Sequence, residues 1–237
     1  LEDKMKLIEL CLTMAYDYKV NYTDVYSQVR CWDTIIYNHL LTKDIIIPPR
    51  EDQVKDTQYE GAYVKDPQLG LHNWIVSFDL NSLYPHLIMQ YNISPETFVG
   101  TEPKAVGVEN FLDEKLNLKW AKDRNVTIAP NGAMFKRDKQ GFLPELMEKM
   151  YTERVVYKKK AIEAKIEYQK TKDPIYSNEI SRCHNIQMAK KISLNSAYGA
   201  IGNQYFRYFD VKQAEAITLG GQLSIRWIER DVNKFMN

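Results

Sequence analysis

Three cationic side chains are spaced so that they could grip a chain of phosphates. Arg154 and Lys158 are four residues apart in a segment without Gly or Pro, so they would share one face of a helix. Lys191 lies in a second such segment, beyond Pro174. If the two helices run antiparallel, the three cations can converge, and phosphate oxygens would accept their charge-assisted hydrogen bonds. The alternative is an ordinary solvated basic face.

The second of these segments also carries a polar stripe. Its members recur at helical spacing, and they are His184, Gln187, Lys191, Asn195 and Tyr198. Gly199 follows the tyrosine, and a glycine next to an aromatic ring lets another backbone or a ligand approach closely. The same spacing is also typical of a helix face that does nothing but meet solvent.

A single carboxylate, Asp79, stands where a metal ligand could be placed. It ends an apolar stretch, 74–80, that is rich in strand formers, and a turn at Ser82 follows. Carboxylate and carbonyl oxygens suit Mg²⁺, although an Asp here could instead cap a helix that begins near Ser82. Two-metal phosphoryl transfer needs a second acid, and no spacing in the chain indicates one. Tyr84 and Pro85 have a plain interpretation as a packed ring and a first-turn proline.

The periodicities predict mostly helices, with a small amount of sheet. We expect helices at about 3–19, 24–41, 82–88, 145–173, 175–200 and 213–237, the last interrupted at Gly220-Gly221. Strands are expected at 74–80 and in a hairpin of 126–128 with 134–135. Residues 42–59 are predicted to form an exposed connection, and 96–123 to be irregular. The turn at 171–174 makes the two long helices an antiparallel pair, the first roughly 40 Å long.

The composition is that of an ordinary folded chain. Its 237 residues carry 32 basic and 31 acidic side chains, a net charge of +1, so any argument for nucleic-acid binding has to be local. The longest apolar runs fall short of the ~18 residues that a membrane span needs. Cys11, Cys31 and Cys183 are scattered and odd in number, which predicts neither a disulfide framework nor a zinc site and favours a reducing compartment.

Two stretches resemble sequence motifs of the family B DNA polymerases. Ser77–Pro85, SFDLNSLYP, resembles motif A, and Lys191–Gly199, KISLNSAYG, resembles motif B. Each motif is specific, and their order around a predicted helical arm makes them more so. Tyr59–Ala62 resembles the family's Y-x-G-G/A element. Short phrases resemble the replicative polymerases of T-even-type bacteriophages, namely 92–97, 206–208 and 227–230. The likeness covers nearly the whole chain.

The resemblance implies a DNA-directed DNA polymerase that transfers a nucleotide from a deoxynucleoside triphosphate to a primer 3′-hydroxyl. Two Mg²⁺ ions would serve the complete enzyme, with Asp79 and the Leu80 carbonyl as ligands in this chain. Tyr84 would exclude a 2′-hydroxyl, and Lys191 could also donate a proton to leaving pyrophosphate. The implied nucleotide-binding set is Leu80, Ser82, Leu83, Tyr84, Arg154, Lys158, Lys191 and Asn195. Implied contacts to the nascent base pair and template are Ser196, Tyr198 and Gly199, and those to DNA are Tyr59 and Gly61.

The fold that follows is α+β: an incomplete polymerase palm, with an inserted antiparallel two-helix fingers arm and a helical N-terminal segment. We expect residues 1–50 to follow an exonuclease module, 51–142 to hold the first part of the palm, 143–203 to form the fingers, and 204–237 to be a returning palm helix. The implied partners are primer–template DNA, deoxynucleoside triphosphates and accessory proteins such as a sliding clamp, with no membrane. A phage-encoded member would act in the cytoplasm of a bacterial host.

The chain departs from the family pattern in three places. His86 replaces the small residue that usually follows Tyr-Pro in motif A. Nothing before Asn237 resembles motif C, which supplies the family's second metal carboxylate, and the exonuclease acids are also missing. Because the chain also opens at Leu1, we expect it to be a piece of a longer polypeptide that is inactive alone. The alternatives are a non-catalytic nucleic-acid-binding module, which the basic arm favours, and a helical arm for protein contact.

Overall fold

A computed structural model describes residues 6–51, 54–55 and 57–236, and the chain folds into two compact units. The helical unit contains Leu1–Lys55 and Phe142–Asp210, and the sheet unit contains Asp56–Gly141 and Val211–Asn237. Each unit is therefore built from two separate stretches of sequence. The start of the first predicted helix, at 3–5, lies outside the described residues.

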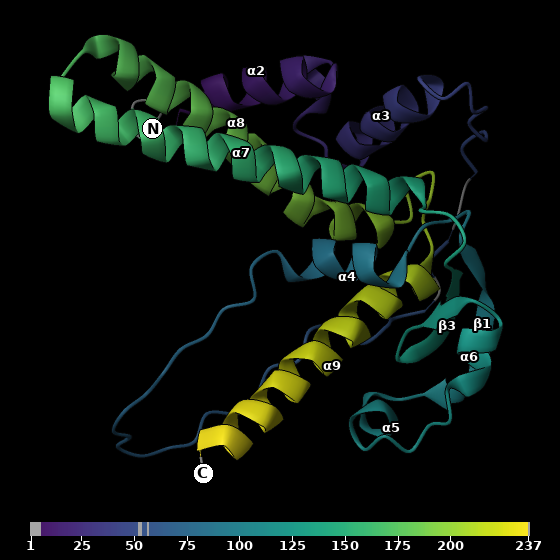
Figure 1. Ribbon diagram of the computed structural model, residues 1–237. Coiled ribbons are helices and arrows are strands. Elements are labelled where there is room, and N and C mark those ends of the chain that lie inside the picture. The colour runs from purple at the N-terminus through teal and green to yellow at the C-terminus, as the bar shows by residue number, and fades with distance from the viewer. Residues whose placement is uncertain (1–5, 52–53, 56, 237) are drawn as a thin grey trace. The chain divides into compact units, whose positions relative to one another are not determined.

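The helical unit is built around a long antiparallel helix pair, α7 (Phe142–Thr171) and α8 (Pro174–Ile201) (Figure 1). The sequence prediction of this pair is confirmed. Asp173 caps α8, because its side chain accepts a hydrogen bond of 2.9 Å from the Ile175 amide, and Pro174 takes the first helical position. The first helix begins earlier than expected, since Pro144 is tolerated within a first turn.

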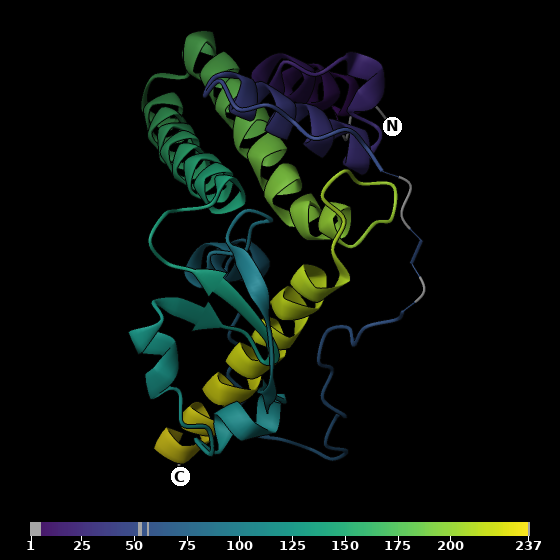
Figure 2. The same ribbon diagram turned by 90° about the vertical axis from the view of Figure 1, so that its right-hand side faces the viewer.

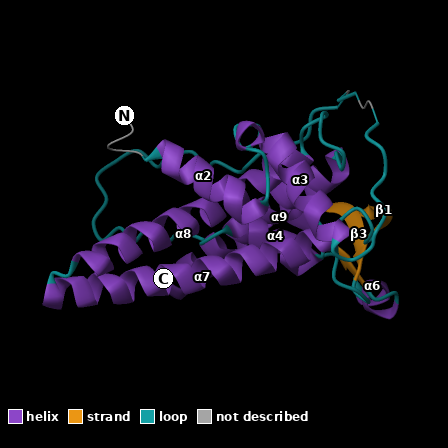
Figure 3. Cartoon of the chain, turned by 90° about the horizontal axis from the view of Figure 1, so that it is seen from above, coloured by secondary structure: helices purple, strands orange, loops and turns teal. Residues whose placement is uncertain are grey.

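Two shorter helices, α2 (Leu7–Tyr18) and α3 (Gln28–Leu41), pack against α8, as the view in Figure 3 shows. Both were predicted, but α3 begins four residues late. The short 3-10 turn at Tyr22–Asp24 comes first, and the Ser27 side chain then caps α3 at the Arg30 amide. Fully buried side chains fill the space among the four helices, namely Trp32, Ile36, Leu143, Met147, Leu194 and Ile201.

The sheet unit holds a three-stranded antiparallel sheet in the order β1-β3-β2. The strands are β1 (Phe98–Val106), β2 (Val126–Ile128) and β3 (Asn131–Lys136), and β3 contacts α9 (Val211–Met236) (Figure 2). The predicted hairpin is confirmed as β2 and β3. Sequence reasoning missed β1, because Gly100 and Pro103 hide its pattern and its register shifts twice along β3. It also missed two five-residue helices, α5 (Val108–Leu112) and α6 (Lys119–Asp123).

Two sequence predictions in the sheet unit are wrong. Residues 74–80 do not form a buried strand: they are exposed, have no regular secondary structure, and no described strand pairs with them. A strand needs a neighbour for its backbone groups, which periodicity alone does not supply. The final helix is also not interrupted at Gly220-Gly221. These glycines lie where α9 meets α4 (Leu83–Tyr91), and a Cβ at either position would press on a tyrosine ring of that neighbour, at 3.0–3.1 Å.

No helix in the described part of the chain combines the length and the hydropathy required to cross a bilayer. The α+β class predicted from the sequence is confirmed by the mixture of long helices and one small antiparallel sheet.

Candidate functional site

An ion pair next to the predicted cations shows which residues of α7 and α8 lie opposite each other along the helix pair. Lys190 Nζ lies 2.5 Å from Glu153 Oε2, so these two side chains face each other across the pair. Their successors are Lys191 and Arg154. Each step along an α-helix turns by about 100°, and because the helices run in opposite directions both steps turn toward the same side.

Helix geometry therefore brings Arg154 and Lys191 to one side of the pair. Their Cα atoms are offset along the axis by two residue rises, about 3 Å, and Lys158 follows one turn further along α7, about 6 Å on. Arg154 is partly buried, whereas Lys158 and Lys191 are exposed. This arrangement can present three positive charges to one polyanionic ligand.

Two adjacent stripes run along α8. The buried stripe consists of Cys183, Lys190, Leu194, Ala197 and Ile201. The polar stripe predicted from the sequence, which includes Lys191, Asn195 and Tyr198, is displaced from it by one residue and is exposed or half-buried throughout. The stripe therefore lies open on the same side as Arg154, where it could contact a ligand or solvent.

A buried lysine, Lys190, is the feature that sequence reasoning missed. Its side chain is only 5% exposed, and it is held by Asp17 Oδ2 at 2.6 Å, by Glu153 and by the face of the Tyr18 ring, 5.0 Å from its centroid. Burial raises the pKa of the Tyr18 phenol, which keeps it neutral. Only the position of Lys190 on the apolar stripe could have indicated its burial.

Two residues of the motif B stretch, Ser196 and Gly199, pack against α3. Trp32 Nε1 donates a hydrogen bond of 3.0 Å to Ser196 Oγ, and the Gln28 side chain donates to the Ser196 carbonyl. A Cβ built on Gly199 would collide with the Gln28 side chain. In this chain the close approach at Gly199 is made by α3, so Ser196 and Gly199 hold the helix in place while Asn195 stays exposed.

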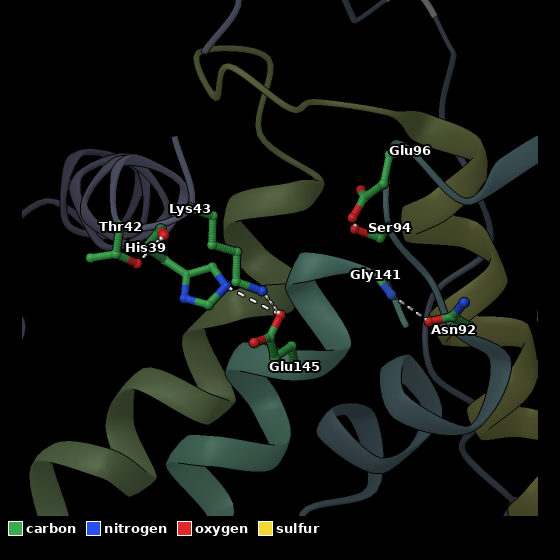
Figure 4. Close-up of polar contacts among 8 residues, drawn as sticks. All are labelled: His39, Thr42, Lys43, Asn92, Ser94, Glu96, Gly141 and Glu145. Atoms are coloured by element: carbon green, nitrogen blue, oxygen red, sulfur yellow. Dashed lines mark hydrogen bonds and ion pairs between the residues drawn. The ribbon is translucent and has the colours of Figure 1, made fainter. Parts of the chain in front are cut away.

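The base of α7 is tied to the end of α3 by Glu145. Lys43 forms an ion pair with Glu145, and His39 Nε2 lies 3.4 Å from Glu145 Oε2 (Figure 4). The Lys43 hydrogen bond holds the pKa of the Glu145 carboxyl below its ordinary value. Burial lowers the pKa of His39, against the opposing effect of Glu145. Glu145 also lies in the first turn of α7, where a negative charge interacts favourably with the positive end of the helix dipole.

In the sheet unit, Asp79 lies at the edge of an open apolar hollow. The hollow has a volume of about 720 Å³ and is lined by the exposed stretch 74–80 and by one face of α9, including Ile225, Ile228 and Val232. Asp79 does not cap α4, because the N-cap position is Ser82, whose backbone is left-handed with φ 56°. His86 fits the first turn of this helix, with Nδ1 2.8 Å from the Ser82 carbonyl oxygen.

Tyr84 is half-buried on α4, beside Tyr59 and α9. Burial raises the pKa of its phenol, and the charge of a nearby Tyr59 phenolate would raise it further. Gly221 of α9 lies against one edge of the ring, since a Cβ built there would be 3.0 Å from Tyr84 Cε1. The sequence-predicted residues Asp79, Leu80, Ser82, Leu83 and Tyr84 thus follow one another along the start of α4.

The stretch 59–65 lies along α9 and is held there by polar side chains one turn apart. Thr218 Oγ1 donates to the Glu60 carbonyl at 2.9 Å, and Gln222 Nε2 donates to the Gly61 carbonyl at 2.7 Å. Both donors are buried. These contacts hold the stretch that carries Tyr59 and Gly61 against α9 rather than leaving it as a free linker.

The side chain of Asn92 connects the end of α4 to the sheet. Asn92, at the C-cap of α4, donates from Nδ2 to the carbonyls of Lys136 at 2.7 Å and Lys139 at 2.8 Å. Its Oδ1 accepts from the Gly141 amide at 2.9 Å, as Figure 4 shows. All polar atoms of this one side chain hold the helix that follows Asp79 against β3 and the chain beyond it.

Among the described residues, no cluster of three His, Cys, Asp or Glu side chains could hold a metal ion. Asp79 contributes one carboxylate, and the Leu80 carbonyl is a second oxygen donor beside it. Hard oxygen donors of this kind fit Mg²⁺, but two of them would fill only part of its coordination shell.

Comparison with known proteins gives a consistent result. The sequence profile described as DNA polymerase family B matches residues 20–236. The chain is 31% identical over 280 residues to the DNA-directed DNA polymerase of Escherichia phage RB69, and 31% identical over 277 residues to that of Enterobacteria phage T4. These alignments cover 100% and 99% of this chain and 30% of each relative.

More distant relatives share part of the chain or the fold alone. DNA polymerase 1 of Pyrococcus abyssi is 34% identical over 175 residues, covering 73% of this chain and 19% of that protein. The solved family B DNA polymerase from the archaeon Pyrobaculum calidifontis aligns with a TM-score of 0.68 at 23% identity, over 97% of this chain and 27% of that one. The chain therefore spans about 30% of the length of the phage relatives it matches.

Proposed function

Because the chain belongs to DNA polymerase family B, we propose that it supplies the nucleotide-binding part of a DNA-directed DNA polymerase. The substrates would be deoxynucleoside triphosphates and primer–template DNA. The single observation that supports this proposal most is the Lys190–Glu153 ion pair between α7 and α8, because helix geometry then places their successors Lys191 and Arg154 on one side of the pair, with Lys158 one turn away. A triphosphate is the ligand that such an arrangement fits.

In the proposed reaction the primer 3′-hydroxyl attacks the α-phosphate of the nucleotide, and pyrophosphate leaves. Arg154, Lys158 and Lys191 bind the phosphate oxygens and neutralise the charge that develops there. Lys191 also gives a proton to the leaving pyrophosphate. Backbone amides around Ser82 and Leu83 hold the triphosphate at the start of α4, where a left-handed Ser82 begins the helix.

Selection of the nucleotide is assigned to aromatic rings and an amide side chain that come from both units. Tyr84 packs under the sugar and excludes a 2′-hydroxyl, a role that the close contact of its ring edge with Gly221 supports. Asn195 and Tyr198, on the open stripe of α8, face the nucleotide and the nascent base pair. Ser196 and Gly199 support that stripe from the α3 side, and Tyr59 and Gly61 contact the DNA.

Asp79 and the Leu80 carbonyl would hold Mg²⁺, which when bound polarises the phosphate and lowers the pKa of the attacking hydroxyl. One carboxylate is fewer than two-metal transfer requires. Since the chain spans about 30% of the phage relatives, we propose that the second acid comes from elsewhere in a longer polypeptide, and that these 237 residues do not extend a primer alone. A sliding clamp partner and a place of action in a host cytoplasm stay predictions.

A nucleotide-binding titration tests the proposal. We expect the polypeptide encoded by the complete gene to bind a deoxynucleoside triphosphate in the presence of primer–template, and Arg154→Ala or Lys191→Ala to weaken binding by about tenfold or more, the cost of one charged hydrogen bond. Lys159→Ala is the matched control, because it removes the same charge from α7 at an exposed position five residues from Arg154 and about 140° away around the helix.

The rival is a nucleic-acid-binding module without catalysis, which the basic arm favours. It predicts DNA binding with a steep salt dependence and no preference for primer ends or nucleotide. If Lys159→Ala and Lys191→Ala weaken DNA binding equally and no nucleotide binds, the rival replaces the polymerase proposal.

A further inference from the structure

Lys190 is a buried cation that the proposed triphosphate grip does not use. It belongs to α8, and its two carboxylate partners come from different helices, Asp17 from α2 at 2.6 Å and Glu153 from α7 at 2.5 Å. The Tyr18 ring covers it from α2. A lysine with 5% of its side chain exposed is tolerated only when its charge is compensated, so all three helices must keep their positions around it.

The two members of the buried Lys190–Glu153 pair are sequence neighbours of the two cations proposed to bind phosphate. Lys190 immediately precedes Lys191, and Glu153 immediately precedes Arg154. A slide of α7 past α8 by one turn, about 5.4 Å, would separate Lys190 from Glu153. The same slide would displace Arg154 from Lys191 by the same distance. The buried ion pair therefore also sets the spacing between Arg154 and Lys191.

We propose that Lys190 is a positioning residue: paired with Glu153 and Asp17, it sets the register in which Arg154 and Lys191 receive a nucleoside triphosphate. This inference rests on the proposed function, because it assigns Lys190 a role only through those two cations. An apolar side chain at this place could fill the same space, but it would tolerate small slides that a short, directional ion pair does not.

The test is steady-state primer extension by the polypeptide of the complete gene, with the deoxynucleoside triphosphate concentration varied. We expect Lys190→Met to raise the nucleotide KM by about tenfold, within the range measured for residues coupled in one charge network, and to lower kcat much less. Lys190→Arg should restore most of the affinity, because it keeps the charge. Arg182→Met, which removes an exposed ion pair with Glu179 on the same helix, is the control and should leave KM unchanged.

A double-mutant cycle separates positioning from general damage to the fold. In a Lys191→Ala background the contact between Lys191 and the triphosphate is already lost, so the register of α7 against α8 no longer affects it. Adding Lys190→Met should then raise KM by less than about threefold. An equal tenfold rise in both backgrounds would overturn the positioning role. So would an unchanged KM in Lys190→Met.

Lys190→Met leaves two carboxylates without their cation and could fail to fold. The triple variant Asp17→Asn/Glu153→Gln/Lys190→Met removes all three charges, so it avoids an uncompensated buried charge. We expect it to fold and to show the same raised KM, and a wild-type KM in it would contradict the inference. If Lys191→Ala itself leaves KM unchanged, the proposed function fails instead, whatever Lys190→Met does.

Discussion

Gly221 of α9 lies against the edge of the Tyr84 ring on α4, so close that a Cβ built on the glycine would be 3.0 Å from Tyr84 Cε1. Its neighbour Gly220 makes the same kind of contact with a different ring, since a Cβ there would be 3.1 Å from Tyr91 Cε2. Two adjacent glycines in the middle of a long helix cost helical stability, and here they are what allows α4 to approach. The Tyr84 ring, which is proposed to exclude a 2′-hydroxyl, thus packs closely against the backbone of α9.

Gly221→Ala should therefore weaken discrimination against ribonucleotides. The added methyl group displaces the Tyr84 ring by a few tenths of an ångström, and we expect a loss of several-fold, less than the ~100-fold that a 1 Å misplacement can cause. The measurement is the ratio of kcat/KM for a deoxynucleotide and the matching ribonucleotide. Gly220→Ala, which presses on Tyr91 instead, should leave that ratio unchanged. Equal changes in both variants would argue against a specific role for Gly221.

Trp32→Phe should lower the free energy of unfolding by about 1–3 kcal/mol, because the change removes the indole donor to Ser196 Oγ at a buried place. Urea unfolding followed by circular dichroism measures it. Trp227→Phe is the control: this indole is 54% exposed, and its replacement should change stability by less than about 0.5 kcal/mol. Similar losses in the two variants would mean that the Trp32 hydrogen bond adds nothing.

The Glu145 ion pair makes a pH-dependent contribution whose sign follows from its lowered pKa. A carboxyl whose pKa is lower in the folded state stabilises the fold above its ordinary pKa of 4.5, and that contribution is lost as the pH falls through the folded value. Glu145→Gln should thus unfold at a lower urea concentration than wild type at pH 7, and the gap should close in acid. A gap that persists unchanged to pH 3 would contradict this account.

Burial lowers the pKa of His39 and adds to the same trend. The folded state keeps this imidazole neutral while the unfolded chain takes up a proton below its ordinary pKa of 6.5, so stability should already begin to fall below that pH. The His39→Gln variant should lose this early part of the decline and keep the later part that comes from Glu145.

Thr218→Val should free the stretch that carries Tyr59 and Gly61. The change removes the donor to the Glu60 carbonyl while keeping the shape of the side chain. We expect faster cleavage within residues 57–72 in limited proteolysis, by several-fold, because local opening of this stretch costs less. Ser224→Ala is the control, since that hydroxyl bonds only within its own helix to the Gly220 carbonyl. Equal cleavage rates in the two variants would rule out this role for Thr218.

The helices and the hairpin could be predicted from the sequence because their signals are local. Asp173 and Pro174 start α8 by chemistry that lies within two residues of the boundary, and the turn before β3 is equally self-contained. The spacing of Arg154 and Lys158 along one helix is likewise visible in the sequence alone.

The remaining features depend on residues that are distant in the sequence. Whether Lys190 is buried depends on acids at 17 and 153, and Gly220-Gly221 is interpretable only once α4 is placed against α9. The strand predicted at 74–80 was wrong for the same reason. Its apolar pattern is typical of a strand, but a strand also requires a partner that periodicity does not identify.

Primer extension with Mg²⁺ and all four deoxynucleoside triphosphates is the most direct test of the central claim. The polypeptide of the complete gene should extend a primer, and its Asp79→Ala variant should not, because the one carboxylate assigned to metal in this chain is lost. The 237-residue chain alone should be inactive. Extension by the 237-residue chain, or full activity in the Asp79→Ala variant, would contradict the account and move the metal site to another acid, such as Asp210 or Asp231.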